Sequence, residues 1–386
     1  MDQKRLAELF EFKLRNIDQA WNDYQMARHE VQSMPFKGII ELTENCNFSC
    51  IMCNRSKSHE LQQYREAVNM PLSRFEKIAD EFFPYAIYVD LRGFGESTIL
   101  PYWPDILEKL SDYPLIRWGI VTNLSLPDPK IWERMIELNF AIGFSCEGAD
   151  KHVFEAIRRG SDYEQILENL SIVTRAIKKH RRGFVYFIST IQDKNRDQMA
   201  AIVSLAALYG VQEVQFKMVQ GENPFDSPDR IALLQKYSMD ALRVALDAGV
   251  RITFNDSRFC DATDELVNKA ANLPVVFVDP ISTAFDNNER LQKQLKIMDD
   301  FNKAHNIAHN KRCPKPYSFM YINNQTEVGT CNHMMSKDSI LVGDLKSQSL
   351  CEVWNSTEIQ KFRQELASGS VNSDQCKWCY EHRLED

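Results

Sequence analysis

The chain has 386 residues and a formal net charge of -8, with 44% hydrophobic and 26% charged residues. This composition is typical of a soluble globular protein, and the acidic surplus argues against a nucleic-acid partner, because such binders usually carry a basic surplus. No uncharged apolar run approaches the roughly 18 residues of a membrane span, and the first residues lack the apolar stretch of a signal peptide. We therefore expect a cytoplasmic protein with no membrane partner.

Residues 1–35 are predicted to form an N-terminal helix, because apolar residues such as Leu6, Leu9 and Phe10 recur at helical spacing among charged ones. Later in the chain, Ser73-x-x-Glu76 and Ser161-x-x-Glu164 each predict a capping box at the start of a helix. These signals define helices that alternate with strands.

Six strands are predicted between residues 36 and 220, each followed by a helical segment and each rich in β-branched and aromatic residues. They are Gly38–Thr43, Ala86–Leu91, Ile116–Thr122, Phe140–Ser145, Phe184–Ser189 and Val214–Met218. The alternation predicts an α/β fold, a partial (β/α)6 TIM-like barrel. In such barrels, functional side chains gather at the C-terminal ends of the strands.

The remainder of the chain departs from this alternation. Residues 221–310 are predicted to be a helical connecting region that contains one more strand, Val250–Phe254. Residues 311–386 are predicted to form a small α+β domain with a hairpin, Tyr317–Ile322 and Glu327–Thr330, a helix over Leu350–Leu366 and a cysteine-rich end. Because a reducing cytoplasm keeps thiols free, its patterned cysteines indicate metal ligands.

Cys46, Cys50 and Cys53 follow the first predicted strand with the spacing CxxxCxxC. Three thiolates in a short loop can hold three irons of a cubane cluster and leave the fourth iron open, whereas structural zinc prefers four tetrahedral ligands. This spacing resembles the signature of the radical S-adenosylmethionine (SAM) superfamily. The resemblance implies that the open iron binds SAM, whose cleavage yields a 5′-deoxyadenosyl radical.

Further segments at predicted strand ends resemble SAM contacts of that family. Gly93-Phe94-Gly95-Glu96 is similar to the GGE motif, and the carboxylate of Glu96 suits the ammonium group of SAM. Two adjacent arginines, Arg158 and Arg159, leave open which one meets the SAM carboxylate. The resemblance implies SAM contacts at Met52, Gly93, Gly95, Glu96, Asn123, Ser145 and Arg158.

Four C-terminal cysteines form a second set, Cys313, Cys331, Cys376 and Cys379. Four thiolates can close a cubane cluster or hold zinc, and the spacing leaves both open. The surrounding sequence resembles the SPASM/twitch extension of radical SAM enzymes. The small number of cysteines favours one auxiliary cluster, similar to 2-deoxy-scyllo-inosamine dehydrogenase. The implied cofactors are SAM and two [4Fe–4S] clusters.

A fully ligated auxiliary cluster suits electron transfer and therefore an oxidation. The resemblance implies a radical SAM oxidoreductase that converts a secondary alcohol of a sugar or aminocyclitol into a ketone, with flavodoxin or ferredoxin as electron donor. One alternative is a peptide maturase that makes an epimer or a crosslink, although residues 1–35 are short for a peptide-recognition domain. Another alternative is a non-catalytic iron–sulfur or zinc scaffold.

The remaining predictions concern three further cysteines and three charged residues near strand ends. Cys351 is expected to be a buried structural thiol, and Cys146 to face the helices because it follows inward-facing Ser145. Cys260, in an expected loop, stays a candidate hydrogen donor. Arg92, Glu147 and Lys217 lie near strand ends, but none of them is identified as a general base, so no catalytic residue is assigned.

Overall fold

The computed structural model describes residues 3–53, 56, 69–219, 225, 227–261, 264–276, 296–301, 303, 312–331, 340–370 and 373–381. Its strands are β1 Lys37–Ile40, β2 Tyr88–Asp90, β3 Arg117–Thr122, β4 Phe140–Ser145, β5 Phe184–Ile191, β6 Glu213–Met218, β7 Arg251–Phe254, β8 Phe319–Ile322, β9 Glu327–Gly329 and β10 Leu341–Asp344. Its helices are α1 Gln3–Gln25, α4 Leu72–Phe82, α5 Trp103–Ser111, α6 Pro129–Glu137, α7 Lys151–Ile157, α8 Tyr163–His180, α9 Met199–Tyr209, α10 Pro228–Ala248, α11 Glu265–Ala271, α14 Leu350–Trp354, α15 Thr357–Ser368 and α16 Asp374–Glu381.

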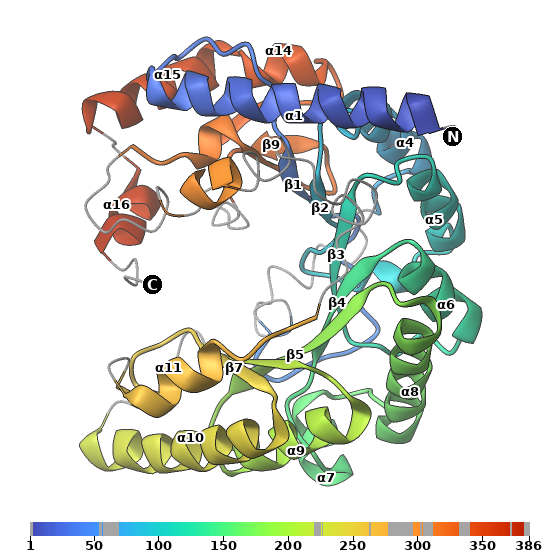
Figure 1. Cartoon of the computed structure of the whole chain (residues 1–386), viewed down its shortest axis with the longest axis vertical. Helices are drawn as coiled ribbons and strands as arrows, with labels where there is room; N and C mark the ends of the chain where they lie inside the picture. The colour runs from blue at the N-terminus through green and yellow to red at the C-terminus, as the bar shows by residue number, and fades with distance from the viewer. Residues whose placement is uncertain are drawn as a thin grey trace.

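All of these strands belong to one sheet with the order β10-β9-β8-β1-β2-β3-β4-β5-β6-β7. Strands β1 to β7 pair in parallel, as the strand–helix alternation predicts. The sheet curves, and helices α4 to α10 lie around its outer side (Figure 1). The predicted α/β class and partial barrel are therefore confirmed, and β7 adds a further parallel strand to the predicted six.

The C-terminal hairpin extends the barrel sheet. Strand β8 pairs in parallel with β1, and Ile39 lies opposite Tyr321. Strands β9 and β10 then continue the sheet in antiparallel pairing. The segment that carries the second cysteine set is thus joined to the first barrel strand by backbone hydrogen bonds.

Each barrel strand presents an apolar face to the helices and a more polar face to the concave side, because side chains alternate along a strand. On β4, Phe140, Ile142 and Phe144 belong to the main core. On β6, Val214 and Phe216 also point into this core. The residues between them face the concave side of the sheet, where polar side chains gather.

The N-terminal helix is shorter than predicted. It ends at Gln25, and the chain then turns because the buried carboxylate of Asp23 accepts hydrogen bonds from the backbone N–H groups of Gln32 and Ser33, each at 3.0 Å. These two bonds satisfy the N–H groups of Gln32 and Ser33, which in a longer helix would donate to backbone carbonyl groups. The prediction of one helix over residues 1–35 is therefore wrong beyond Gln25.

The helix predicted over Leu350–Leu366 is two helices, α14 and α15. Asn355 interrupts it, because its side-chain amide exchanges two 3.0 Å hydrogen bonds with the backbone of Val31. Ser356 then caps α15 by accepting a bond from the N–H of Ile359. In α14, Cys351 is exposed, so its predicted burial is wrong.

Both predicted capping boxes are also wrong. Helix α4 begins directly after Pro71 without a side-chain cap, and helix α8 is capped by Asp162 rather than Ser161. Of the predicted connecting region, the structure shows α10, β7 and α11, while residues 277–295 and 304–311 lie outside the described residues. Within the described helices, none is both long and apolar enough to cross a membrane.

Candidate active site

The loop of Cys46, Cys50 and Cys53 follows β1 and lies at the C-terminal end of the strands. Backbone bonds fix it against the segment after α7: the N–H of Ser49 donates to the carbonyl of Arg159 at 2.9 Å. The Sγ of Cys46 faces two N–H donors, the backbone of Phe48 at 3.5 Å and Asn123 Nδ2 at 3.9 Å. Such donors stabilise a thiolate, the form of cysteine that binds metal.

The three thiols influence one another electrostatically. Burial raises the pKa of Cys50 to about 11; Arg158 opposes this rise, and the neighbouring Cys46 and Cys53 thiols add to it. Metal binding would remove these protons, since a coordinating thiol is deprotonated. The Nη1 of Arg158 lies 3.8 Å from the Sγ of Cys50 and provides a cation beside the resulting thiolate.

The spacing of the trio differs from that of a single-ion site. In a tetrahedral zinc site, Zn–S bonds of about 2.3 Å place the sulfurs about 3.8 Å apart. Among the described residues, the groups of three ligand atoms that lie within 4.8 Å of one another do not include Cys46, Cys50 and Cys53. Three thiolates in one short loop supply the donor set of a cubane cluster with one open iron.

The Gly93–Glu96 segment packs directly on the cysteine loop. The N–H of Gly95 donates to the carbonyl of Thr43 at 3.1 Å, and the N–H of Glu96 donates to that of Asn45 at 2.8 Å. A Cβ at Gly95 would lie 2.4 Å from the Asn45 carbonyl oxygen, so only glycine allows this approach.

Glu96 ties the end of β2 to the end of β3. Its carboxylate is 2% exposed and accepts 2.7 Å hydrogen bonds from the Thr122 hydroxyl and from the Asn123 N–H. Thr98 donates both its hydroxyl and its N–H to the same carboxylate. Burial raises the pKa of Glu96, while these donors lower it. Three of these donors converge on Oε1 and one reaches Oε2, so Oε2 keeps acceptor capacity. The predicted contact of Glu96 with the SAM ammonium group stays a prediction.

Arg158 is the arginine that faces the site, because Arg159 is exposed. The Nε of Arg158 donates to Glu147, whose side chain is 1% exposed, and the other carboxylate oxygen of Glu147 accepts the N–H of Thr190 at 3.3 Å. Burial alone would lower the pKa of Arg158, but Glu147 and the Cys50 thiol raise it above its usual value, so the guanidinium stays charged. Ser145, at the end of β4, is also buried.

Replacing Arg158 by glutamine is expected to lower the free energy of unfolding of the metal-free protein by about 3–5 kcal/mol, because it leaves Glu147 buried without a counter-ion. Urea unfolding measures this loss. The matched variant Arg159→Gln, one residue along the chain and exposed, should change stability by less than about 0.5 kcal/mol. Equal effects of the two substitutions would contradict the pairing of Arg158 with Glu147.

The second cysteine set gathers around helix α15 of the C-terminal segment. Cys313, Cys331 and Cys376 pack around Phe362 and Leu366 in a small cluster separate from the main core. Cys379 is partly buried on α16, one turn after Cys376. As for the first set, the described thiols include no trio within 4.8 Å.

Two buried thiols lie outside both sets. Cys146 is fully buried, as predicted, and its Sγ lies 3.6 Å from the carbonyl oxygen of Gly148. Cys260 is 7% exposed. The structure gives Cys146 a structural environment and leaves Cys260 as the thiol of the two that reaches solvent.

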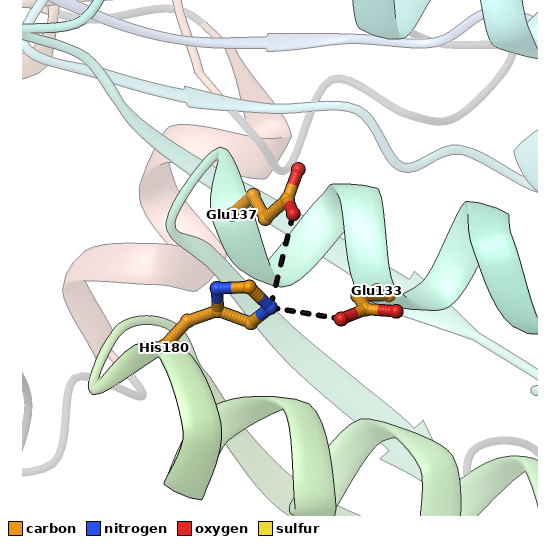
Figure 2. A group of neighbouring side chains, drawn as sticks. All are labelled: Glu133, Glu137 and His180. Atoms are coloured by element: carbon orange, nitrogen blue, oxygen red, sulfur yellow. Dashed lines mark hydrogen bonds and ion pairs between the residues drawn. The ribbon is translucent and has the colours of Figure 1, made fainter.

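A carboxylate–histidine group on the outside of the barrel also has metal-ligand composition. His180 Nε2 on α8 lies 3.0 Å from Glu133 and 3.7 Å from Glu137 on α6 (Figure 2). Lys179 and Arg134 also pair with these two carboxylates. Since cations already neutralise both acids, we interpret the group as an ion-pair network that links α6 to α8.

Glu41 is a polar residue of the site that was not among the predicted site residues. Its buried carboxylate accepts the Phe94 N–H at 2.6 Å and the Tyr321 hydroxyl at 2.8 Å, so it joins β1, the Gly93 segment and β8. A Cβ at Gly93 would lie 2.3 Å from this carboxylate. Burial raises the pKa of Glu41 to about 7, although both hydrogen bonds lower it. The sequence signal that could have identified Glu41 was a single charged residue in the predicted strand Gly38–Thr43.

Glu41→Gln is expected to stabilise the metal-free protein at about pH 8 by on the order of 2 kcal/mol, with little effect near pH 5. The folded pKa of about 7 exceeds the ordinary value of 4.5, so the folded state takes up a proton and stability falls as pH rises through this window. Thermal unfolding at both pH values measures the difference. The exposed control Glu168→Gln should show no such pH dependence, and an equal gain at both pH values would contradict the assignment.

Comparison with known protein families gives two matches in this chain. Residues 40–206 match the model of the Radical SAM superfamily, and residues 313–380 match that of SPASM, an iron–sulfur cluster-binding domain. A probable GTP 3′,8-cyclase from Sulfurisphaera tokodaii is 24% identical over 204 residues, covering 51% of this chain and 61% of that protein. An uncharacterized protein from Methanocaldococcus jannaschii is 22% identical over 195 residues, covering 47% and 62%. The matched segments thus span less than two thirds of these relatives.

Solved structures share the fold over most of the chain. Streptococcus suis SuiB bound to SAM has a TM-score of 0.58 at 12% identity, covering 91% of this chain and 72% of that one. The anSMEcpe structure with bound SAM has a TM-score of 0.56 at 14% identity, covering 91% and 88%. The structure of BtrN with SAM and 2-DOIA has a TM-score of 0.39, which is too low to support an argument. The predicted similarity to 2-deoxy-scyllo-inosamine dehydrogenase is therefore not confirmed.

Proposed function

We propose that this chain, which joins a radical SAM domain over residues 40–206 to a SPASM domain over residues 313–380, oxidises a secondary alcohol of a sugar or aminocyclitol to a ketone. The observation that carries the proposal is the gathering of Cys313, Cys331 and Cys376 apart from the N-terminal trio. A second set of thiolates that fills a cluster suits electron transfer. Removal of two hydrogens from an alcohol requires such an acceptor.

The residues that would hold the cofactors follow from the two cysteine sets. Cys46, Cys50 and Cys53 would bind one [4Fe–4S] cluster, and the four C-terminal cysteines would bind the other. When bound, these groups and SAM supply the reducing electron, the radical that removes a substrate hydrogen, and the acceptor for the remaining electron. The proposed SAM contacts are Met52, Gly93, Gly95, Glu96, Asn123, Ser145 and Arg158.

The chain's own side chains organise this site. Arg158 places a cation beside the Cys50 sulfur, and Asn123 donates both toward Cys46 and to Asn47 Oδ1 at 2.9 Å. Glu96 and Glu41 hold the strand ends in register through several donors each. Pre-organised side chains of this kind restrict a reactive species to its substrate.

Peptide maturation is the second candidate. One of the matched folds, SuiB, was also solved with its precursor peptide SuiA, and anSMEcpe was solved with a peptide. The sequence identity of these structures to this chain is 12%, so their support for a peptide substrate comes from the shared fold alone.

Mass spectrometry after anaerobic reconstitution tests the two candidates together. The protein is incubated with SAM and a reductant, chemical or flavodoxin-based, and with panels of sugars, aminocyclitols and peptides. We expect a sugar or aminocyclitol that loses two hydrogen atoms while 5′-deoxyadenosine accumulates. Modification of a peptide instead would move the assignment to the second candidate, and absence of 5′-deoxyadenosine in every reaction would contradict both.

A further inference from the structure

A polar cluster lies on the concave face of the sheet, below the strand ends that carry the cysteine loop. On β2 and the residues after it, Val89 and Leu91 point into the core, so Asp90 and Arg92 face the concave side. On β6, Phe216 and Met218 point into the core, so Lys217 faces the same side. The three charged residues therefore lie on one face, Asp90 and Arg92 from β2 and the residues after it and Lys217 from β6.

Asp90 and Arg92 form the fixed part of this cluster. Asp90 Oδ2 accepts hydrogen bonds from the Tyr88 hydroxyl and from Arg92 Nη2, both at 2.9 Å. Gly119 lies opposite Asp90 in the sheet, and a Cβ there would come within 2.7 Å of this oxygen. Strand β3 thus leaves room at Gly119 for the carboxylate of Asp90, whose side chain is 1% exposed.

Two polar atoms of this pair are buried without a partner among the described residues: Asp90 Oδ1 and Arg92 Nε. One is an acceptor and the other a donor. Buried polar groups are usually satisfied, because an unmade hydrogen bond costs the full desolvation of the group. A ligand that reaches the pair must therefore supply both a hydroxyl or N–H donor for Asp90 and an oxygen acceptor for Arg92.

Lys217 adds a second cation without a second anion. Within the described part of the chain it has neither an ion-pair nor a hydrogen-bond partner, although it is partly buried. Burial lowers its pKa first, and the nearby Arg92 lowers it further, while Asp90 raises it. Two cations in range of one carboxylate leave an excess of positive charge on a partly buried surface.

We propose that the substrate is a hydroxylated acid whose carboxylate or phosphate binds between Arg92 and Lys217, with a neighbouring hydroxyl donating to Asp90 Oδ1. The anion would neutralise the excess charge, and charge-assisted bonds are the strong ones in a partly dry site. This inference narrows the proposed substrates to acidic sugars, in place of cationic aminocyclitols, and rests on the proposed alcohol oxidation for the nature of the reaction.

Thermal unfolding with three probes tests the inference without turnover. The probes are gluconate, glucose 6-phosphate and neutral glucitol at matched ionic strength, and they separate a carboxylate, a phosphate and a plain polyol. A ligand that binds only the folded state raises Tm. We expect one or both acids to raise the Tm of the wild-type protein, and glucitol to leave it unchanged.

Lys217→Met should weaken acid binding about ten-fold or more, because it removes one charge-assisted bond. The same variant without ligand should unfold at a Tm about 2 °C higher than the wild type, because it removes a partly buried cation that faces Arg92. Lys217→Arg should restore acid binding. The exposed control Arg243→Gln, on α10, should keep the full acid response.

Equal stabilisation by glucitol, no response to either acid, or an unchanged acid response in Lys217→Met would each overturn the inference. A ligand-free Lys217→Met that is less stable than the wild type would also overturn it, since it would show that Lys217 is a structural ion-pair partner. Release of 5′-deoxyadenosine by the wild type tests the proposed function separately. Its absence alongside an acid-specific Tm response would remove the function and keep the anion site.

Discussion

Replacing Cys46, Cys50 and Cys53 together by alanine is expected to halve the bound iron and to abolish release of 5′-deoxyadenosine. The trio supplies all the thiolates at the end of β1, and its N–H donors and Arg158 are placed around those sulfurs. Two cubane clusters give about eight irons per chain, so about four should remain on the C-terminal set. Iron analysis and chromatography of the SAM reaction after anaerobic reconstitution measure both quantities.

Cys351→Ala is the matched control for this triple substitution. Cys351 is exposed on α14 and belongs to neither cysteine set, so this variant should keep about eight irons and full SAM cleavage. A triple variant that still released 5′-deoxyadenosine would contradict the placement of the SAM-binding cluster at the first strand end. A triple variant that lost all iron would show that the two sets are not independent.

Replacing Cys376 and Cys379 by alanine should leave about four irons on the chain. The α16 pair supplies half of the C-terminal set, and Cys376 packs in the same small cluster as Cys313 and Cys331. We expect 5′-deoxyadenosine to form without net oxidation of substrate, because the acceptor for the remaining electron is lost. Iron content and the ratio of oxidised product to 5′-deoxyadenosine measure the effect.

Metal analysis of the wild-type protein tests whether the C-terminal cysteines bind an iron–sulfur cluster or zinc. About eight irons with negligible zinc are expected. About four irons with one zinc per chain would assign the C-terminal set to zinc and contradict the electron-acceptor role. Oxidised product in the normal ratio from the Cys376→Ala, Cys379→Ala variant would contradict that role independently.

The barrel strands were predictable from sequence because their side chains alternate or form short apolar runs between helices. The predicted Phe140–Ser145 strand has the same bounds in the structure, and the other barrel strands differ at their ends. Hydrogen bonds to residues beyond the predicted helix turns account for the errors in helix bounds. Asp23 ends α1 through the backbone of Ser33, and Asn355 divides the C-terminal helix through Val31, a residue more than three hundred positions away.

The cysteine sets could be read from spacing, whereas the polar face of the sheet could not. Glu41 follows β1, whereas Asp90 lies in β2 and Lys217 in β6, and their place on one face depends on pairing register and on which face each strand turns inward. Tyr321 joins this face only because β8 pairs with β1 across the chain. No local sequence pattern specifies that pairing, so the residues that surround a substrate emerge only from the fold.

Electron paramagnetic resonance on the Cys376→Ala, Cys379→Ala variant tests whether the first cysteine loop holds a cluster that binds SAM. This variant should keep a cluster only at Cys46, Cys50 and Cys53, so any signal after reduction reports on that loop. We expect a [4Fe–4S] signal whose g values change when SAM is added, because one iron is open to it. A reduced protein without a cluster signal, or with a signal that SAM leaves unchanged, would show that the loop does not bind SAM in this way.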